Sequence, residues 1–461
     1  MACVRAVSAK NISTSRLRFP FLDTTPVWDI RWLLCLFPIW WLLGAEQIVW
    51  MAGTVWVAIK LIAQQRGHVK LLLPVRLLLL FVLIHLVSGL FVVESVRYVT
   101  FGRNFGTYIA GLAVAVVVTN SVNSWHQVQY LLKALFVAIG FSALVSMSAA
   151  LDIWRPQFLS LIGQFLPEWI LATDYGNQIA YRTVGQQSWF IGLGRYYRLN
   201  GFFLFATLYA AALVYIVPFL VFAAKWATGW RRWLWWGFIL LMLITLLFTT
   251  ARIPALSLLL GGMFFLLFVS RQRWLYQGLG IGVALFLMAG LAVTFLAEEV
   301  TQQSSVSGDL IGIVETAWYA RGTGSPLSRF YVYENTLSGI AERPFFGWGT
   351  ERHIVGSRLP AGSHSEYLAI LYRQGFIGFV VHLGILASLW IYTRPPQHNT
   401  SQAADFLRYG RWFLIVFFIS SISIVPVTDT TTFLILWLCC SLLLVTRKIL
   451  YRQVEYGKEI I

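Results

Sequence analysis

The chain has 461 residues, of which 58% are hydrophobic and only 12% are charged, and its mean hydropathy is +0.70. A soluble fold cannot hide so much apolar surface, so the composition excludes an ordinary soluble protein and indicates one embedded in a lipid bilayer. The formal net charge of +16 is explained by basic cytoplasmic loops and anionic lipid head groups, and no nucleic-acid partner is expected.

The apolar stretches of the chain predict a series of membrane-spanning helices. The first thirty residues are basic and polar and lack the apolar core of a cleavable signal peptide. The run 32–63 is too long for one span and is interrupted by Gly44, Glu46 and Gln47, which predicts a helical hairpin with two short legs. Further windows of about 20 apolar residues predict spans near 77–94, 105–120, 129–150, 201–224, 233–250, 253–270, 275–297, 366–393, 412–426 and 431–446. The predicted fold is therefore all-α, a polytopic membrane protein with about twelve spans.

An even number of spans places both termini on the same side of the membrane, and the distribution of Lys and Arg predicts that this side is the cytoplasm. Basic residues gather in the segments predicted to lie inside: Arg5, Lys10, Arg16, Arg18 and Arg31; Lys60, Arg66 and Lys70; Lys225, Arg231 and Arg232; Arg271 and Arg273; Arg394, Arg408 and Arg411; Arg447, Lys448, Arg452 and Lys458. The expected organisation is a cytoplasmic segment 1–31, helices one to nine in 32–297 with an outer loop 151–200, a large extracytoplasmic loop 298–364, helices ten to twelve in 365–446, and a cytoplasmic tail 447–461.

The two long outer segments, 151–200 and 298–364, are candidates for function, because loops of that length are usually functional. In the second, apolar residues recur at helical spacing from Arg329 onward. The predicted helix ends near Glu342, since Arg343 precedes Pro344 and the residue before a proline disfavours the helical conformation.

Several common chemistries have no motif in this sequence. There is no GxxxxGK[ST] phosphate loop, no HExxH and no Cys/His cluster, so no ATP, metal or other cofactor is expected. Cys3, Cys35, Cys439 and Cys440 do not form a disulfide framework. Glu46 is the only acidic residue deep in the predicted span regions, which disfavours an ion-coupled transporter.

The most distinctive polar residue is His364, which comes just before the predicted helix 366–393 at the outer surface. The helix dipole at that position favours a neutral imidazole, and a neutral imidazole can accept a proton as a general base. The alternative is that His364 belongs to an ordinary capping segment in which Ser363 or Ser365 is the helix cap.

Arginines at the outer helix ends are the second candidate set. Arg198 precedes the span 201–224, Arg252 lies in a short outer turn, and Arg329 opens the helical stretch of the large loop. Guanidinium groups bind phosphate oxygens bidentately, so three of them would suit a diphosphate. The alternative is that each extends to lipid head groups. Weaker candidates are Arg195, Arg321 and Arg343, and the pair Glu298 and Glu299 is more typical of a solvated helix end.

The motif formed by His364, Ser365, nine residues, Gly375, two residues and Gly378 resembles the signature H[NSQ]x9GxxG of the O-antigen ligase and polymerase superfamily. The stretch 328–349, the run Arg198-Leu-Asn-Gly and the pair Ala251-Arg252 are also similar to family positions and follow in the same order. The resemblance is strongest over 195–380, and the ends of the chain match only in hydropathy.

This resemblance implies a metal-independent, multi-span glycosyltransferase on the outer face of the bacterial inner membrane that makes lipopolysaccharide or another surface polysaccharide. The implied donor is a glycan on undecaprenyl diphosphate, and the acceptor is a hydroxyl of a lipid core or of another lipid-linked glycan. His364 would then be the base, the diphosphate would be held by Arg198, Arg252 and Arg329, and the anomeric centre would be inverted. Further possible site positions are Ser365, Arg343, Gly375 and Gly378; Ser365 replaces the Asn of many relatives.

The ligase and the polymerase remain open alternatives, because both need an activated hydroxyl and a diphosphate leaving group. A transporter of lipid-linked glycans is less favoured, since the sequence has neither an internal repeat nor charges along several spans. A non-catalytic membrane scaffold would explain the hydropathy and the charge bias, but it would leave the His364 motif as a coincidence.

Overall fold

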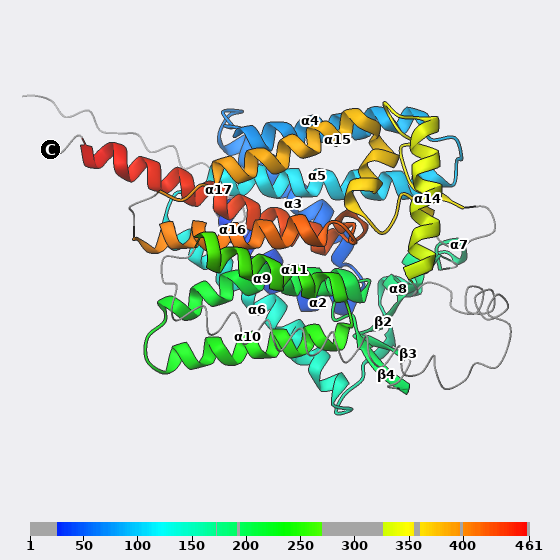
Figure 1. The fold of residues 1–461 in the computed structure, drawn as a ribbon, viewed down its shortest axis with the longest axis horizontal. Helices are drawn as coiled ribbons and strands as arrows, with labels where there is room; N and C mark the ends of the chain where they lie inside the picture. Colours follow the sequence, from blue (N-terminus) through cyan, green and yellow to red (C-terminus); the bar gives the residue numbers. More distant parts are fainter. Residues whose placement is uncertain are drawn as a thin grey trace, which may run out of the picture.

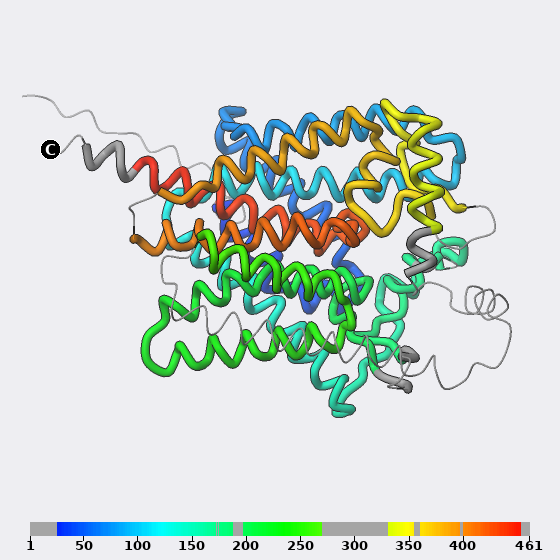
Figure 2. The backbone as a smooth tube through the Cα atoms, viewed as in Figure 1, coloured from blue at the N-terminus to red at the C-terminus, as the bar shows by residue number. Residues whose placement is uncertain are grey.

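A computed structural model of the chain describes residues 25–171, 173–190, 194–269, 326–354, 360–396 and 400–458. Long helices run side by side through one bundle, and the C-terminal helix leaves it at the end opposite to α14 (Pro326–Glu342) (Figures 1 and 2). In these ranges nine helices are long and apolar enough to cross a membrane, or ten with one bent pair. The predicted class, an all-α polytopic membrane protein, is confirmed, whereas the count of twelve is not. The predicted span 275–297 lies outside the described residues.

The helices that meet this criterion follow the predicted spans closely. They are α3 (Glu46–Gln64), α4 (Leu73–Ser88) with η2 (Gly89–Phe91), α5 (Arg97–Ser121), α6 (Trp125–Ala150), α9 (Ala206–Trp226), α10 (Trp230–Thr249), α11 (Arg252–Phe264) with η4 (Phe265–Val269), α15 (Glu366–Tyr392) and α17 (Thr430–Lys458). Within a bilayer a helix satisfies all of its own backbone hydrogen bonds, so apolar sequence length is sufficient to locate these elements.

The first hairpin differs from its prediction. Its first leg begins at Pro26, inside the segment assigned to 1–31, and consists of α1 (Pro26–Cys35) and α2 (Phe37–Leu43), which are bent by 55°. Pro38 lies in the first turn of α2 and has no backbone N–H to continue α1, which accounts for the break. The chain then reverses at Gly44, whose φ of 77° favours glycine, and α3 begins at Glu46.

Of the predicted span 412–426, residues 412–420 form the second half of a longer helix, α16 (Gln402–Ser420), and the rest lies beyond the end of that helix. Its first half carries a buried carboxylate, Asp405, which accepts a hydrogen bond from Lys225 at 2.6 Å and is also paired with Arg408. These charges lower the local hydropathy, so the predicted span began at residue 412 although the helix begins at Gln402. Burial is possible because the charges are paired inside the protein.

Helices that are far apart in the sequence form the core of the bundle. α15 packs along α4, α17 along α5, and α16 along α9 (Figure 1). Glycine permits close approach at two of the helix crossings. A Cβ at Gly111 would lie 2.4 Å from the ring of Phe433, and one at Gly410 would lie 2.2 Å from Leu443.

The end of the bundle that carries α14, which is the end predicted to face outward, has short strands and helices that hydropathy did not predict. Antiparallel pairs form between β1 (Gln157–Leu159) and β2 (Tyr181–Thr183), β3 (Gly185–Phe190) and β4 (Gly194–Leu199), and β5 (Arg352–His353) and β6 (Pro360–Ala361). Short helical turns accompany them: η3 (Ile162–Phe165), α7 (Glu168–Leu171), α8 (Asp174–Ala180) and η5 (Pro426–Thr428). α14 lies across the end of the bundle and ends at Glu342, as predicted (Figure 1).

Hydrogen bonds between buried polar side chains connect these short strands and turns to the long helices. Arg182 of β2 donates to the carboxylate of Glu46 at 2.7 Å, and both side chains are buried. Next to it, Gln47 donates to Asp429 at 2.6 Å and accepts from the backbone N–H of Thr430 at 2.9 Å. The start of α3 therefore links the outer segment to the start of α17.

We expect Arg182→Ala to lower the free energy of unfolding by about 3 kcal/mol, because removal of one partner leaves a buried, uncompensated carboxylate at Glu46. The control is Arg155→Ala, since Arg155 pairs at 3.1 Å with the exposed Asp152. That loss should stay below about 1 kcal/mol. Denaturant unfolding of the purified protein in detergent micelles measures both, and equal losses would contradict the structural role of the buried pair.

Candidate active site

His364 lies immediately outside the first turn of α15. The N-cap is Ser365, whose side chain accepts a hydrogen bond from the backbone N–H of Leu368 at 3.5 Å. The capping role considered for Ser365 is therefore confirmed, and His364 lies just before the N-terminal end of a predicted membrane helix. The φ angle of His364 is 65°, a left-handed conformation that is uncommon for residues other than glycine.

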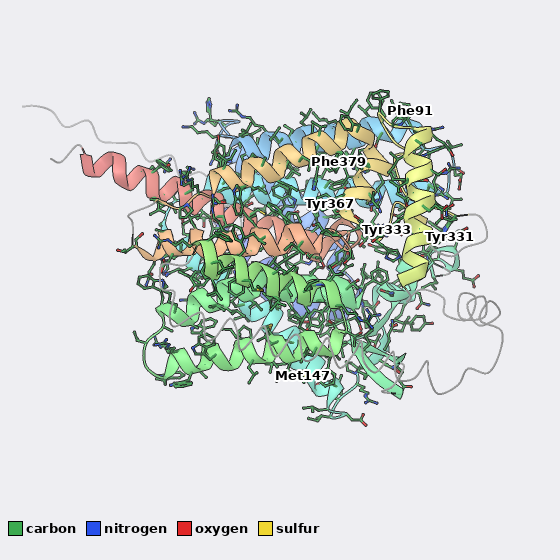
Figure 3. The ribbon with its side chains drawn as sticks, in the orientation of Figure 1. Phe91, Met147, Tyr331, Tyr333, Tyr367 and Phe379 are labelled. Atoms are coloured by element: carbon green, nitrogen blue, oxygen red, sulfur yellow. The ribbon has the colours of Figure 1, made fainter. Side chains whose placement is uncertain are left out.

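Three hydrogen bonds hold the backbone around His364, two from α14 and one from the chain after α16. The hydroxyl of Tyr333 on α14 donates to the His364 carbonyl at 3.2 Å, and Tyr333 lies on the side of α14 that faces the bundle (Figure 3). The N–H of Gly362 donates to Thr336 of the same helix at 2.9 Å. On the other side, the N–H of Glu366 donates to the carbonyl of Ser421 at 2.8 Å, just beyond α16.

Arg198 and Arg252 both lie at the turn between α10 (Trp230–Thr249) and α11 (Arg252–Phe264). The Nε–H of Arg198, on β4, donates to the carbonyl of Thr249 at 3.0 Å, and Thr249 is the last residue of α10. Arg252 is the first residue of α11, just after that turn. α11 packs antiparallel to α16, with Trp412 donating to the Leu258 carbonyl at 3.3 Å. The outer ends of α11 and α16 therefore bring the two arginines to the end of the bundle that carries His364.

The other predicted arginines have different environments. Arg329 lies in α14, and its side chain is outside the described residues, as are the Arg195 side chain, Arg321, Glu298 and Glu299. Arg343 follows α14, donates to the carbonyl of Phe91 at 2.8 Å and stacks 3.9 Å above the ring of Trp348. These contacts tie Arg343 to the chain after α4 and give it a structural role.

The signature glycine Gly375 forms a kink inside α15, with φ 66° and ψ −167°. The kink frees the carbonyls of Tyr372 and Arg373, which accept from the N–H groups of Trp348 at 2.9 Å and Gly349 at 2.8 Å. A Cβ at Gly375 would lie 2.2 Å from the carbonyl oxygen of Phe345. Gly375 therefore lets the segment 343–349 dock against the helix.

Gly378 lies one turn further along α15. A Cβ there would lie 2.4 Å from the side chain of Gln374 and 3.6 Å from Ile84 of α4. Gly378 therefore leaves room for the Gln374 side chain of the same helix, whereas the distance to Ile84 is that of an ordinary contact.

Sequence reasoning missed an ion pair between the buried Arg373 and the partly buried Glu351. Arg373 is 1% exposed, and its guanidinium contacts the Glu351 carboxylate, which lies 3.6 Å from Arg103. Burial alone would raise the pKa of Glu351, but the charges of Arg373, Arg103 and Arg97 together hold that pKa below its usual range. A charged residue inside the apolar window 366–393 was the available signal.

A second buried group, Glu366, faces the interior of the bundle. It lines a small, mostly apolar cavity together with Tyr108 and His382. Neither its Oε2 nor the Nε2 of His382 has a hydrogen-bond partner among the described residues. Across the same ranges, no group of three or more His, Cys, Asp or Glu side chains gathers as a metal site.

Together these features describe a multi-pass membrane protein in which His364, Arg198 and Arg252 lie at the same end of the helix bundle. Residues 237–383 match the family model described as O-Antigen ligase. The match spans most of α10 through the first part of α15, includes Arg252 and His364, and confirms the resemblance to the O-antigen ligase and polymerase superfamily. The family implies a glycosyl-transferring enzyme of this type. The comparison with curated proteins gave no match.

We expect Gly375→Ala to reduce the yield and the melting temperature of the protein, because its Cβ would strike the Phe345 carbonyl and its φ is positive. The matched control is Gly384→Ala in the same helix, where a Cβ meets only Leu77 at 3.6 Å. Thermal unfolding of both variants in nanodiscs gives the comparison. Equal melting temperatures would show that the kink tolerates a side chain.

Proposed function

We propose that the chain is a membrane glycosyltransferase that transfers or polymerises a glycan carried on undecaprenyl diphosphate. The acceptor is a hydroxyl of a lipid core or of another lipid-linked glycan on the outer face of the bacterial inner membrane. The observation that supports this most is the position of His364 at the outer start of α15, on the end of the bundle that carries Arg198 and Arg252. The family match over 237–383 supports the same reaction class.

In the proposed reaction the imidazole of His364 accepts the proton of the acceptor hydroxyl. The hydroxyl oxygen attacks the anomeric carbon, and the bond from that carbon to the diphosphate oxygen breaks, its electron pair leaving with the diphosphate. Attack opposite the leaving group inverts the anomeric centre. Arg198, Arg252 and Arg329 bind the diphosphate and stabilise the negative charge that grows on it, so the reaction is proposed to need no metal.

The orientation is part of the proposal. Arg231 and Arg232 lie in the first turn of α10, and Arg447 and Lys448 lie near the end of α17, which leaves the bundle opposite to α14 (Figure 1). Basic residues at that end support a cytoplasmic location for both termini. The outer segments would then be 151–200 and 298–364, with spans in 32–297 and 365–446 and cytoplasmic ends 1–31 and 447–461.

Deleting the gene should change the glycan that remains on the lipid carrier, because the proposed enzyme consumes that glycan. Full-length polymer that stays on the carrier is the expected result for a ligase, and single repeat units without polymer are expected for a polymerase. The measurement is electrophoresis and mass spectrometry of the extracted lipid-linked glycan. An unchanged lipid-linked pool with unchanged surface polysaccharide would contradict both forms of the proposal.

His364→Ala should abolish glycan transfer in the complemented deletion strain, at normal protein level, because no base remains at that position. The control is His126→Ala, since His126 also lies in the first turn of a helix, α6, but at the cytoplasmic end. Full transfer by His364→Ala would refute the base assignment.

Arg252→Ala should raise the KM for the lipid-linked donor, whereas Arg232→Ala at the cytoplasmic start of α10 should not. An unchanged donor KM for Arg252→Ala would refute the role of Arg252.

A further inference from the structure

The backbone of His364 is held in a conformation that its own residue type does not favour. Only three other described residues besides glycine have a positive φ: Arg66, Asp152 and Thr250. Such a conformation persists only where the surrounding structure enforces it, and it tends to occur at functional sites. The contacts that enforce it at His364 therefore determine where the imidazole lies.

The segment before His364 is held at Gly362 from two sides. The N–H of Gly362 donates to Thr336 of α14 at 2.9 Å, and its carbonyl accepts from the guanidinium of Arg373 at 3.1 Å. Gly362 has a φ of 75° and packs against Tyr372, where a Cβ would lie 2.7 Å from the ring. Arg373 thus reaches back from α15 to fix the turn that leads into His364.

Arg373 is itself fixed by Glu351. The same Nη2 that donates to Gly362 also donates to the Glu351 carboxylate. Glu351 is anchored to α5, because its carboxylate lies 3.6 Å from Arg103 and its carbonyl accepts from Arg97. The turn at Gly362 is therefore connected through one buried guanidinium to a second membrane helix.

The contacts of Arg373 with Glu351 and Gly362 select one conformation of the chain rather than add much to the free energy of unfolding. The Nε and Nη1 groups of Arg373 are buried and have no hydrogen-bond partner among the described residues. An ion pair that includes a buried guanidinium with unsatisfied donors is weak evidence for stability, and such pairs select a single conformation in some proteins.

We propose that Arg373, oriented by Glu351, is a positioning residue for His364: it holds the Gly362 carbonyl and thereby sets the imidazole against the acceptor hydroxyl. The proposal rests on the proposed function of His364. Loss of the contact misplaces the base without touching the arginines assigned to the donor. A misplaced base slows the chemical step and leaves donor binding intact.

The test uses the full chain in nanodiscs and the lipid-linked glycan extracted from the deletion strain, with release of undecaprenyl diphosphate as the assay. Arg373→Lys keeps the charge, but its shorter side chain cannot place a donor at the position from which Nη2 reaches both Glu351 and Gly362. We expect kcat to fall by about tenfold to a hundredfold, with a donor KM close to that of the unmodified protein. Glu351→Gln should show the same pattern, and the double variant should be no slower than the slower single variant.

The matched control is Arg411→Lys. Arg411 also donates to a backbone carbonyl of α15, that of Trp390, at 3.0 Å, but near the opposite end of that helix. We expect its kcat to stay unchanged. If Arg373→Lys folds poorly, Tyr333→Phe tests the same idea, since it removes only the hydroxyl that donates to the His364 carbonyl.

Equal kcat values for Arg373→Lys and Arg411→Lys would overturn the positioning role, as would a parallel change of kcat and KM. The two proposals fail in different ways. If His364→Ala retains full transfer, the proposed function itself is wrong. If His364→Ala is inactive while Arg373→Lys, Glu351→Gln and Tyr333→Phe keep normal kcat, only the positioning role is wrong.

Discussion

The structure depends on one constraint: a lipid bilayer offers no hydrogen-bond partner to polar groups, so the chain must satisfy them internally. Regular helices meet this requirement across the membrane, and irregular chain collects at the helix ends. At the outer end the polar side chains pair with one another, as in Arg182 with Glu46 and Gln47 with Asp429. Because these pairs are buried, they hold the short strands and turns against the helices. The positions of residues in this layer are therefore set by the helices.

The kink at Gly375 shows how the same constraint shapes the site. A left-handed residue inside a helix leaves the carbonyls of Tyr372 and Arg373 without helical partners, and the segment 343–349 supplies N–H groups to both. That docking carries Glu351 to Arg373 and so closes the connection to the turn before His364. The spacing between His364 and Gly375 thus has a physical reason. The kink at Gly375 binds the segment 343–349, and the same helix begins just after His364, so both ends of the chain between them are held by α15.

Much of this fold could be predicted from hydropathy, since a span is a local property of the sequence. The helix start beside His364, the cap at Ser365 and the end of α14 at Glu342 followed from local signals as well. The start of α16 did not, because the charge of Asp405 reads as polar until its partner Lys225 is known. The strands of the outer layer and the pair of Arg373 with Glu351 depend on contacts between distant segments, which no local pattern reveals.

The proposed reaction is compatible with either a ligase or a polymerase. In that proposal, His364 removes a proton from the attacking oxygen and Arg198 and Arg252 stabilise the departing diphosphate, and these atoms are common to both reactions. The contacts that fix the His364 backbone come from α14, α15 and the chain after α16, so the proposed base is held by the protein itself. The choice of acceptor must then be made by the surrounding outer segments. Their short strands and turns can vary without disturbing the helix ends that hold the reacting groups.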